Sequence, residues 1–160
     1  MSSSNPVIRG NSLYTIVEGP TWEEAEANAV ALGGHLVTIN DAEEDIFLTS
    51  SLGLGFFFGL TDKEQEGDFS WVNGEPLVYT NWYLNYQPDN DKGNQDYGAY
   101  HPNFGGAWDD VDNGQTGFSR GIAEIPLAPN NTPNKFSNTH RRCQGRTNHQ
   151  HQLISHTRCR

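Results

Sequence analysis

Cysteine is almost absent from this 160-residue chain, and both copies, Cys143 and Cys159, lie near its C-terminal end. The residues before them form no disulfide, so their fold depends on a core and on any bound ion. The length favours one domain. No stretch reaches the roughly 18 apolar residues of a membrane span. The N-terminus lacks a positively charged start followed by an apolar run, so no signal peptide is visible.

Basic residues are scarce before residue 129, where only Arg9, Lys63, Lys92 and Arg120 occur against all 20 Asp and Glu residues. This part carries a charge of −16 with histidine neutral, and six Lys and Arg residues in the tail bring the chain to −10. So acidic a segment is expected to repel nucleic acid and anionic membranes, which excludes both as partners. A bound cation would cancel part of its self-repulsion.

The tail at 129–160 has no acid, few apolar residues and no periodicity, which predicts a disordered basic segment. A zinc site is an alternative, although the spacing of its candidate ligands matches no compact zinc motif. Another alternative is unselected sequence appended to a domain that ends at Ala128 or Pro129, which would make the chain one unit of a longer protein. The candidate zinc ligands are His140, Cys143, His149, His151, His156 and Cys159.

Capping signals before residue 129 predict two helices. Thr21 and Glu24 form a capping box that opens the first helix, and the glycines at 33–34 end it. Asn40 or Asp41 opens the second helix, which ends at the glycines of 53–55. The spacing of apolar residues assigns an inward face to each helix. The residues expected to face inward are Trp22, Ala25, Ala29 and Leu32 in the first helix, and Ile46, Phe47 and Leu52 in the second.

Short runs of β-branched, aromatic and apolar residues predict strands. The run 56–60 is wholly apolar, which is typical of a strand buried on both faces. Two helices with several short antiparallel strands give the fold class α+β. Residues 1–10 are expected to form a linker, and 11–128 the domain. The remaining strands are expected at 12–17, 35–39, 69–72 and 118–125.

The stretch from Gln87 to Val111 crowds short oxygen-bearing side chains among Gly, Pro and Asn. Such a loop buries little apolar surface and holds several carboxylates that repel one another. Ca²⁺ takes about 6–8 oxygen ligands from carboxylates, amides and waters, so it suits this composition. A solvated polar loop with ordinary Asx-turns is the alternative interpretation.

The order of motifs in this stretch resembles that of the C-type lectin-like domain family. The motifs are Gln87-Pro88-Asp89, then Gln95-Asp96, then Trp108-Asp109-Asp110. The resemblance covers roughly 11–125 and includes the apolar-Gly-Leu signature at 58–60 and an Asn-Trp pair at 81–82. It implies the C-type lectin-like fold, in which the last strand pairs beside the first. Animal members usually carry disulfides, and this chain departs from them by having none in its globular part.

The resemblance also implies a calcium site that binds sugar. In sugar-binding members, the ion takes two vicinal sugar hydroxyls, and the side chains that hold the metal also pair with those hydroxyls. Pro88 is expected to follow a cis peptide bond there. The order Gln-Pro-Asp goes with galactose-type sugars in the family. The residues implied for both calcium and carbohydrate are Gln87, Asp89, Gln95, Asp109 and Asp110.

Two of these positions depart from the family pattern. Gln95 is neutral where the family usually has Glu, and Asp109 is charged where it usually has Asn. The exchange conserves the charge of the site, so calcium binding survives the comparison. The layout of donors and acceptors around the sugar changes, however, and this weakens the galactose assignment.

An auxiliary calcium site and an aromatic face for the sugar complete the predicted site. The auxiliary ligands implied by the resemblance are Asp62, Glu66, Asn90 and Asp96, and the alternative for Asp62 and Glu66 is exposed loop charge. Galactose binders usually need an aromatic ring against the apolar side of the sugar. The candidates for this contact are Tyr86, Tyr100 and Phe104, and a structural role is the alternative for Tyr86 and Tyr100. Trp108 is expected in the core.

Catalysis is not expected, because the carboxylates cluster as cation ligands and His35 and His101 are isolated in the sequence. The predicted function is a calcium-dependent carbohydrate-binding module with no catalytic residues. The alternative is a calcium-stabilised lectin-like module that binds a surface protein, serves in adhesion or spaces repeats without binding sugar. The family resemblance implies an extracellular or cell-surface location.

Overall fold

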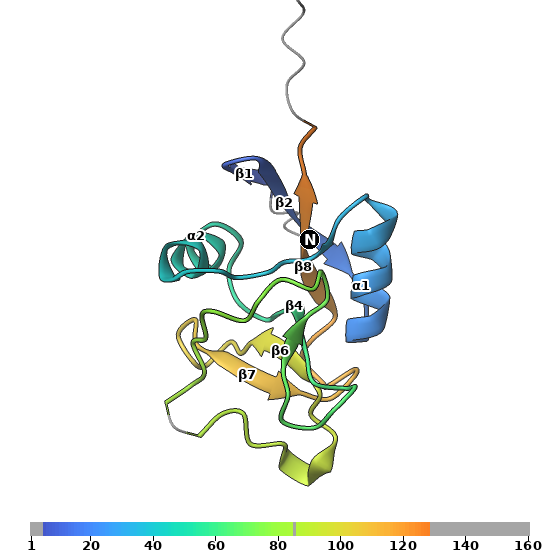
Figure 1. The fold of residues 1–160 in the computed structure, drawn as a ribbon, viewed down its shortest axis with the longest axis vertical. Helices are drawn as coiled ribbons and strands as arrows, with labels where there is room; N and C mark the ends of the chain where they lie inside the picture. The colour runs from blue at the N-terminus through green and yellow to red at the C-terminus, as the bar shows by residue number, and fades with distance from the viewer. Residues whose placement is uncertain (1–4, 85, 129–160) are drawn as a thin grey trace, which may run out of the picture. The chain divides into compact units, whose positions relative to one another are not determined.

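The computed structural model describes residues 5–84 and 86–128, which belong to one compact unit. The predicted tail lies outside the described residues. Eight strands form one sheet, and two helices pack against it (Figure 1). The α+β class and the C-type lectin-like fold are confirmed by this arrangement and by the comparisons given below. No helix in the described ranges has the length and apolar character that crossing a membrane requires.

The sheet has the strand order β1-β2-β8-β4-β6-β7, with β3 on β8 and β5 on β4. All pairings are antiparallel except that of β4 with β8. The long pairing of β2 with β8 confirms that the last strand lies beside the first predicted one. The strands are β1 Val7–Arg9, β2 Ser12–Glu18, β3 His35–Leu36, β4 Phe56–Thr61, β5 Ser70–Trp71, β6 Tyr97–Tyr100, β7 Trp108–Val111 and β8 Arg120–Pro126.

The helices α1 Trp22–Ala31 and α2 Ala42–Leu52 begin where their capping residues predict. The Thr21 side chain accepts a hydrogen bond from Glu24 N, and that of Asp41 accepts one from Glu44 N. Gly33, with φ of 89°, follows the end of α1, and Gly53 caps α2 with φ of 95°. Both stops need the left-handed conformation that glycine adopts without strain.

The linker predicted for residues 1–10 is wrong for its second half. Val7–Arg9 forms β1 and pairs with β2 in antiparallel register. Arg9 also reaches α2, where its guanidinium lies 3.4 Å from both Asp41 and Glu44. The polar composition of this segment concealed a short edge strand that is held by its hairpin partner and by charge.

Strand β4 divides the core into two clusters, which explains its wholly apolar sequence. Phe56, Phe58 and Leu60 pack in the cluster beneath α2, whereas Phe57 packs in the cluster beneath α1. Gly59 allows β3 to come close, because a Cβ there would lie 2.4 Å from the Leu36 carbonyl oxygen. The prediction of a strand buried on both faces is therefore confirmed.

Two of the predicted inward faces are wrong in part. Leu32 lies beyond the end of α1 and is half exposed, and Ile46 on α2 is 66% exposed. Leu52 is buried and Phe47 is partly buried against the core, as predicted. The inward residues that were not predicted are Glu44, Asp45 and Leu48. Buried carboxylates need hydrogen-bond partners, and the sheet supplies them.

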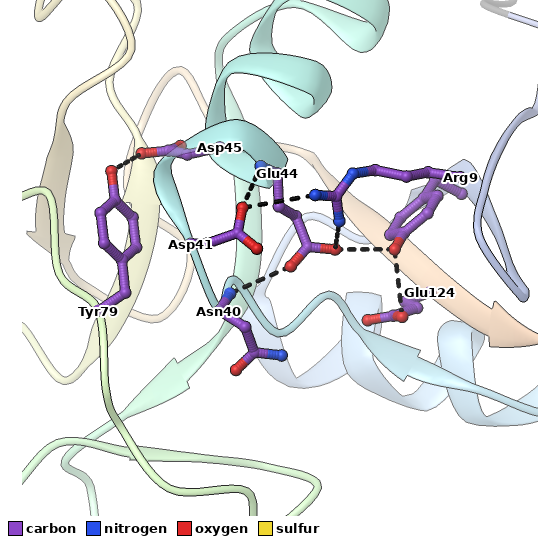
Figure 2. A network of polar contacts seen from close by, with 8 residues as sticks. Arg9, Asn40, Asp41, Glu44, Asp45, Tyr79 and Glu124 are labelled. Atoms are coloured by element: carbon purple, nitrogen blue, oxygen red, sulfur yellow. Dashed lines mark hydrogen bonds and ion pairs between the residues drawn. The ribbon is translucent and has the colours of Figure 1, made fainter.

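Figure 2 shows contacts of both carboxylates: those of Glu44 reach the sheet, and the one drawn for Asp45 reaches Tyr79 in the loop after β5. Glu44 accepts hydrogen bonds from the Tyr14 hydroxyl at 2.8 Å and from Asn40 N at 3.1 Å, and Arg9 approaches the same carboxylate. Asp45 accepts from the Tyr79 hydroxyl at 2.9 Å. The further donors to Asp45 are Asn81 Nδ2, the Tyr100 hydroxyl and Trp108 Nε1.

Candidate functional site

Strand β7 carries the two carboxylates on which the long loop is built. Its pairing with β6 sets Asp109 opposite Ala99 and Asp110 opposite Gly98. Both aspartates are buried, and Asp110 is only 1% exposed. Trp108 precedes them with no exposed surface, so it lies in the core as predicted. The strand thus holds the start of the site rigidly.

Asp110 fixes the middle of the loop by binding its backbone. Its two carboxylate oxygens accept from Asp89 N at 3.0 Å and from Asn90 N at 2.7 Å. Hydrogen bonds to an ionised acceptor are among the stronger ones in proteins. The peptide bond between Gln87 and Pro88 is cis, which confirms that expectation.

Two buried oxygens at this place accept no hydrogen bond from the described residues. They are Gln87 Oε1 and Asp109 Oδ1. An orphaned buried acceptor is costly in a folded protein and calls for an unseen partner such as an ion or water. Amide and carboxylate oxygens are the ligands that Ca²⁺ prefers, so the residues present fit this ion.

The electrostatics of Asp109 indicate a site that lacks positive charge. The pKa of Asp109 is raised from 3.8 to about 7, first by burial and then by the charges of Asp110 and Asp89. Burial also raises the pKa of Asp110, although the backbone amides of the loop oppose this shift. Both shifts show that this pocket disfavours the ionised carboxylates that it contains. A cation would reverse that preference.

Gln95 joins the same loop through its backbone and its carboxamide. Gln95 N donates to Asn90 Oδ1 at 3.1 Å, and Gln95 Oε1 accepts from Asp91 N. The intervening turn, η1 Asp91–Gly93, contains the left-handed residue Lys92 and follows Asn90, which is also left-handed. The oxygen of Gln95 is therefore already partnered, unlike those of Gln87 and Asp109.

The four predicted auxiliary ligands lie near one another, although the three acids among them do not form a metal-binding group. Asp62 is buried, its Oδ2 accepts from Gly67 N at 2.8 Å, and its Oδ1 has no partner among the described residues. Burial raises the pKa of Asp62, with a further contribution from Asp96. The pKa of Glu66 is raised by desolvation and then by the charges of Asp62, Asp96 and Asp110, while the Asn90 side chain lowers it. Whether these residues hold a second ion stays a prediction.

Within 5–84 and 86–128, no group of three or more His, Cys, Asp or Glu side chains is arranged to hold a metal ion. Two members of the principal set, Gln87 and Gln95, are amides, and the oxygens of Asp110 are turned to backbone N–H groups. The loop is thus organised by its own hydrogen bonds, with free oxygens at Gln87 and Asp109.

The aromatic candidates separate clearly. Tyr86 is 73% exposed beside Gln87, so it remains a candidate for sugar contact. Tyr100 is not one, because its ring has no exposed surface and its hydroxyl donates to Asp45. Phe104 is stacked on Tyr83 with ring centroids 3.9 Å apart. Tyr83 was not predicted as part of this region, because its only signal in the sequence is its place next to Trp82.

Neither histidine of the domain is arranged for catalysis with its neighbours. His35 Nδ1 lies 2.8 Å from Glu26 Oε1 on the surface. The ring of His101 packs on Phe104 with centroids 4.2 Å apart, and desolvation lowers its pKa. The contacts of His35 and His101 are therefore those of a solvated surface residue and a packed residue.

Curated relatives share about a third of their aligned residues with this chain. A perlucin-like protein of Mytilus galloprovincialis is 31% identical over 108 residues, which are 63% of this chain and 68% of the relative. A hemolymph lipopolysaccharide-binding protein of Periplaneta americana is 37% identical over 99 residues. That match covers 53% of this chain but only 39% of the relative, so much of the relative lies outside the comparison.

The alignments with solved structures of similar fold include nearly the whole length of those structures. The lectin CEL-I from Cucumaria echinata has a TM-score of 0.66 and 27% identity, over 79% of this chain and 99% of its own. The carbohydrate-recognition domain of cow CD23 has a TM-score of 0.70 at 24% identity, over 81% and 98%. A calcium-independent type II antifreeze protein has a TM-score of 0.69 at 22% identity, over 80% and 96%. The last two likenesses show the fold alone.

The family itself is established by sequence. A family model described as "Lectin C-type domain" matches residues 18–117, which is more than half of the chain. Members of this family are carbohydrate-binding proteins without enzymatic activity, so the expectation of a non-catalytic domain is confirmed. The chain belongs to the C-type lectin domain family.

Proposed function

We propose that this domain binds Ca²⁺ in its long loop and, through that ion, a carbohydrate. The observation that carries the proposal is the pair of buried oxygens, Gln87 Oε1 and Asp109 Oδ1, that accept no hydrogen bond from the described residues. Both lie where the family resemblance predicts metal ligands. Asp89 and Asp110 supply two further carboxylates, and Gln95 supplies an amide oxygen.

The ion would supply a positive centre on which two sugar hydroxyls can be held. The residues around it do the rest of the recognition. Carboxylates such as Asp89 and Asp109 accept hydrogen bonds from the hydroxyls, whereas the amide of Gln87 donates to them. Tyr86 is exposed beside Gln87 and can cover the apolar side of a sugar ring.

The order of Gln87 and Asp89 around the cis peptide bond supports a galactose-type preference. The exchanged charges of Gln95 and Asp109 alter the donors next to the sugar, so the preference has to be measured against mannose-type sugars. Relatives named as lectins and as a lipopolysaccharide-binding protein support a glycan as the partner. They also support an extracellular or cell-surface location.

A second candidate function is a lectin-like interaction module that binds a protein and no sugar. The observation that favours it is that the loop is already folded by its own hydrogen bonds. The Asp110 carboxylate accepts from the backbone N–H groups of 89–90, and the Gln95 side chain accepts from that of Asp91. The similar fold of a calcium-independent protein agrees with it. Leu84 and Tyr86 are then the exposed apolar contacts in the loop.

Thermal unfolding in Ca²⁺ and in EDTA tests the proposal, followed by a glycan array in both buffers. Binding to the folded form alone stabilises it by about 2.7 kcal/mol at a hundredfold excess over Kd. We therefore expect a rise of several degrees in Tm with Ca²⁺, a smaller rise in Asp109→Ala, and an unchanged rise in Asp68→Ala, which removes an exposed carboxylate.

Retention of a glycan that EDTA abolishes would support the lectin function. Identical melts in both buffers contradict calcium binding, and calcium binding without retention of any glycan leaves the interaction module.

A further inference from the structure

A polar cavity of about 320 Å³ adjoins the predicted calcium site. It lies between η1 and the loop that follows β7, and Gln95 belongs to both the cavity wall and the predicted ligand set. Its volume is at the lower end of the range for small-molecule sites, which suits a single ring better than a long chain. The polar side chains that line it are Asp91, Lys92, Gln95, Asp112, Gln115 and Thr116.

The far wall of this cavity is anchored to α1. Asn113 donates from Nδ2 to Glu23 Oε2 at 3.2 Å, and its Oδ1 accepts from Glu23 N at 3.4 Å. Gly114 lies against the start of the helix, where a Cβ would be 3.3 Å from the Thr21 methyl group. Phe118, at the end of the loop, is buried in the core. The wall is therefore held in place before any ligand arrives, which lowers the cost of binding.

Several hydrogen-bonding groups of the cavity remain free. Gln95 is only 8% exposed, and its Oε1 accepts from Asp91 N, but its Nε2 donates to none of the described residues. Gln115 repeats this pattern, because its Oε1 accepts from Asp112 N at 3.2 Å while its Nε2 has no acceptor in the described part of the chain. Two residues with free amide donors, Gln95 and Gln115, thus line a cavity whose wall also contains Asp91 and Asp112.

We propose that this cavity binds a second, neutral sugar residue, joined to the one held at the calcium site. The inference rests on the proposed lectin function and specifies its ligand as a disaccharide or longer glycan. A hydroxyl group both donates and accepts, so it matches a wall that mixes free amide donors with carboxylate acceptors. The charges of Asp91, Asp112 and Lys92 sum to −1, so an acidic sugar is disfavoured in the same place.

Calorimetry on the calcium-loaded protein tests this proposal with defined sugars. Methyl galactoside is compared with lactose and melibiose, which attach a second ring through different linkages, and methyl mannoside with mannobiose. Two added hydrogen bonds correspond to a gain in affinity of about 5- to 150-fold. We expect at least one neutral disaccharide to bind about fivefold or more tightly than its monosaccharide. A disaccharide of galactose and glucuronic acid is expected to gain nothing.

The variant Gln115→Glu removes the free amide donor but keeps the oxygen that accepts from Asp112 N. This variant should lose the gain in affinity for the disaccharide over the monosaccharide, while its affinity for the monosaccharide stays the same. Thr116→Val should reduce the same gain in affinity without adding charge. The matched control is Asn73→Asp, outside the long loop, which makes the same amide-to-carboxylate change and keeps an oxygen for Glu75 N. It should leave both affinities unchanged.

The outcomes separate this proposal from the one on which it rests. Binding of no sugar in Ca²⁺ would refute the lectin function itself. Equal affinity for monosaccharides and all neutral disaccharides, or tighter binding of the acidic disaccharide, would overturn the second sugar position and leave the lectin intact. A disaccharide gain that persists in both Gln115→Glu and Thr116→Val would place the second ring elsewhere.

Discussion

The indole nitrogen of Trp108 on β7 lies 3.4 Å from a carboxylate oxygen of Asp45 on α2, and both side chains are buried. The next two residues of β7, Asp109 and Asp110, form the floor of the candidate site. Tyr100 on β6 donates its hydroxyl to the same oxygen of Asp45. One carboxylate therefore ties the helix to both strands that carry the loop.

Removing this carboxylate should strongly destabilise the domain. Asp45→Ala leaves the donors of Tyr79, Asn81 and Tyr100 without their acceptor, and we expect a loss of about 3–5 kcal/mol in the free energy of unfolding. Tyr100→Phe removes one of these hydrogen bonds and should cost about 1–2 kcal/mol. Urea unfolding measures both losses.

The control for that variant is Tyr86→Phe, which removes a hydroxyl from a tyrosine that is 73% exposed. Its unfolding free energy should stay within about 0.5 kcal/mol of the wild type, as is usual at the surface. Equal effects of Tyr100→Phe and Tyr86→Phe would show that the hydroxyl of Tyr100 contributes nothing to stability.

The second prediction concerns pH. The pKa of Asp109 in the folded, calcium-free domain is raised to about 7 from 3.8. Between these values the folded state holds a proton that the unfolded state has lost. The stability due to this proton is fully present below about pH 4 and is lost as pH rises through about 7. Calcium requires the ionised carboxylate, so its affinity should change in the opposite direction.

Calorimetric titrations with Ca²⁺ between pH 5 and 8, in buffers of different ionisation enthalpy, measure this linkage. We expect the affinity to rise up to about tenfold per pH unit below 7 and to level off above it, with proton release over the same range. Asp109→Asn should bind more weakly and show a flatter profile with less proton release. A wild-type affinity that does not change with pH would remove Asp109 from the ligand set.

The parts of the fold that the sequence predicted are those in which local chemistry and packing agree. Thr21 and Asp41 cap helices because their side chains meet the first free amides. The apolar run at 56–60 forms a strand with a cluster on each face. At the site, the cis bond at Pro88 and the core position of Trp108 followed from the family pattern.

The predictions that failed concern residues whose orientation is set by hydrogen-bond partners from distant parts of the chain and not by their hydrophobicity. Ile46 faces outward on α2, and Glu44 and Asp45 face inward, because tyrosine hydroxyls and an indole satisfy the carboxylates. Tyr100 looked like a surface aromatic beside the loop, yet its hydroxyl is one of those partners. No local pattern encodes such pairings, because their members are far apart in the chain.

The third prediction concerns the choice of sugar. The double variant Gln87→Glu, Asp89→Asn reverses the order of amide and carboxylate around Pro88 and conserves the charge. It should keep calcium binding and shift preference from galactose-type towards mannose-type sugars, because axial and equatorial hydroxyl pairs present their donors differently. Monosaccharide affinities near millimolar, or about 4 kcal/mol, are expected.

Such weak binding needs a multivalent surface for its measurement. Retention on galactose and mannose resins in Ca²⁺ compares the double variant with the wild type. Asp89→Ala should abolish retention on both resins, whereas Glu64→Ala, which removes an exposed loop carboxylate, should not. An unchanged sugar preference in the double variant would contradict the role of these two residues in selecting hydroxyls.

The last prediction distinguishes a second calcium ion from a solvated turn. One carboxylate oxygen of Asp62 accepts a hydrogen bond from Gly67 N, and the other has no partner among the described residues. The pKa of Asp62 is raised by burial and then by the charge of Asp96. Asp62→Asn keeps an oxygen for Gly67 N and removes the disfavoured charge.

We therefore expect Asp62→Asn to melt at the same temperature as the wild type or higher in EDTA, yet to gain less from Ca²⁺. Calorimetry should count two calcium ions in the wild type and one in the variant. Asp68→Asn, an exposed carboxylate in the same loop, should leave both quantities unchanged. If Asp62 has only a structural role, the substitution would change the melting temperature by the same amount in EDTA and in Ca²⁺, because its contact with Gly67 N is the same in both buffers.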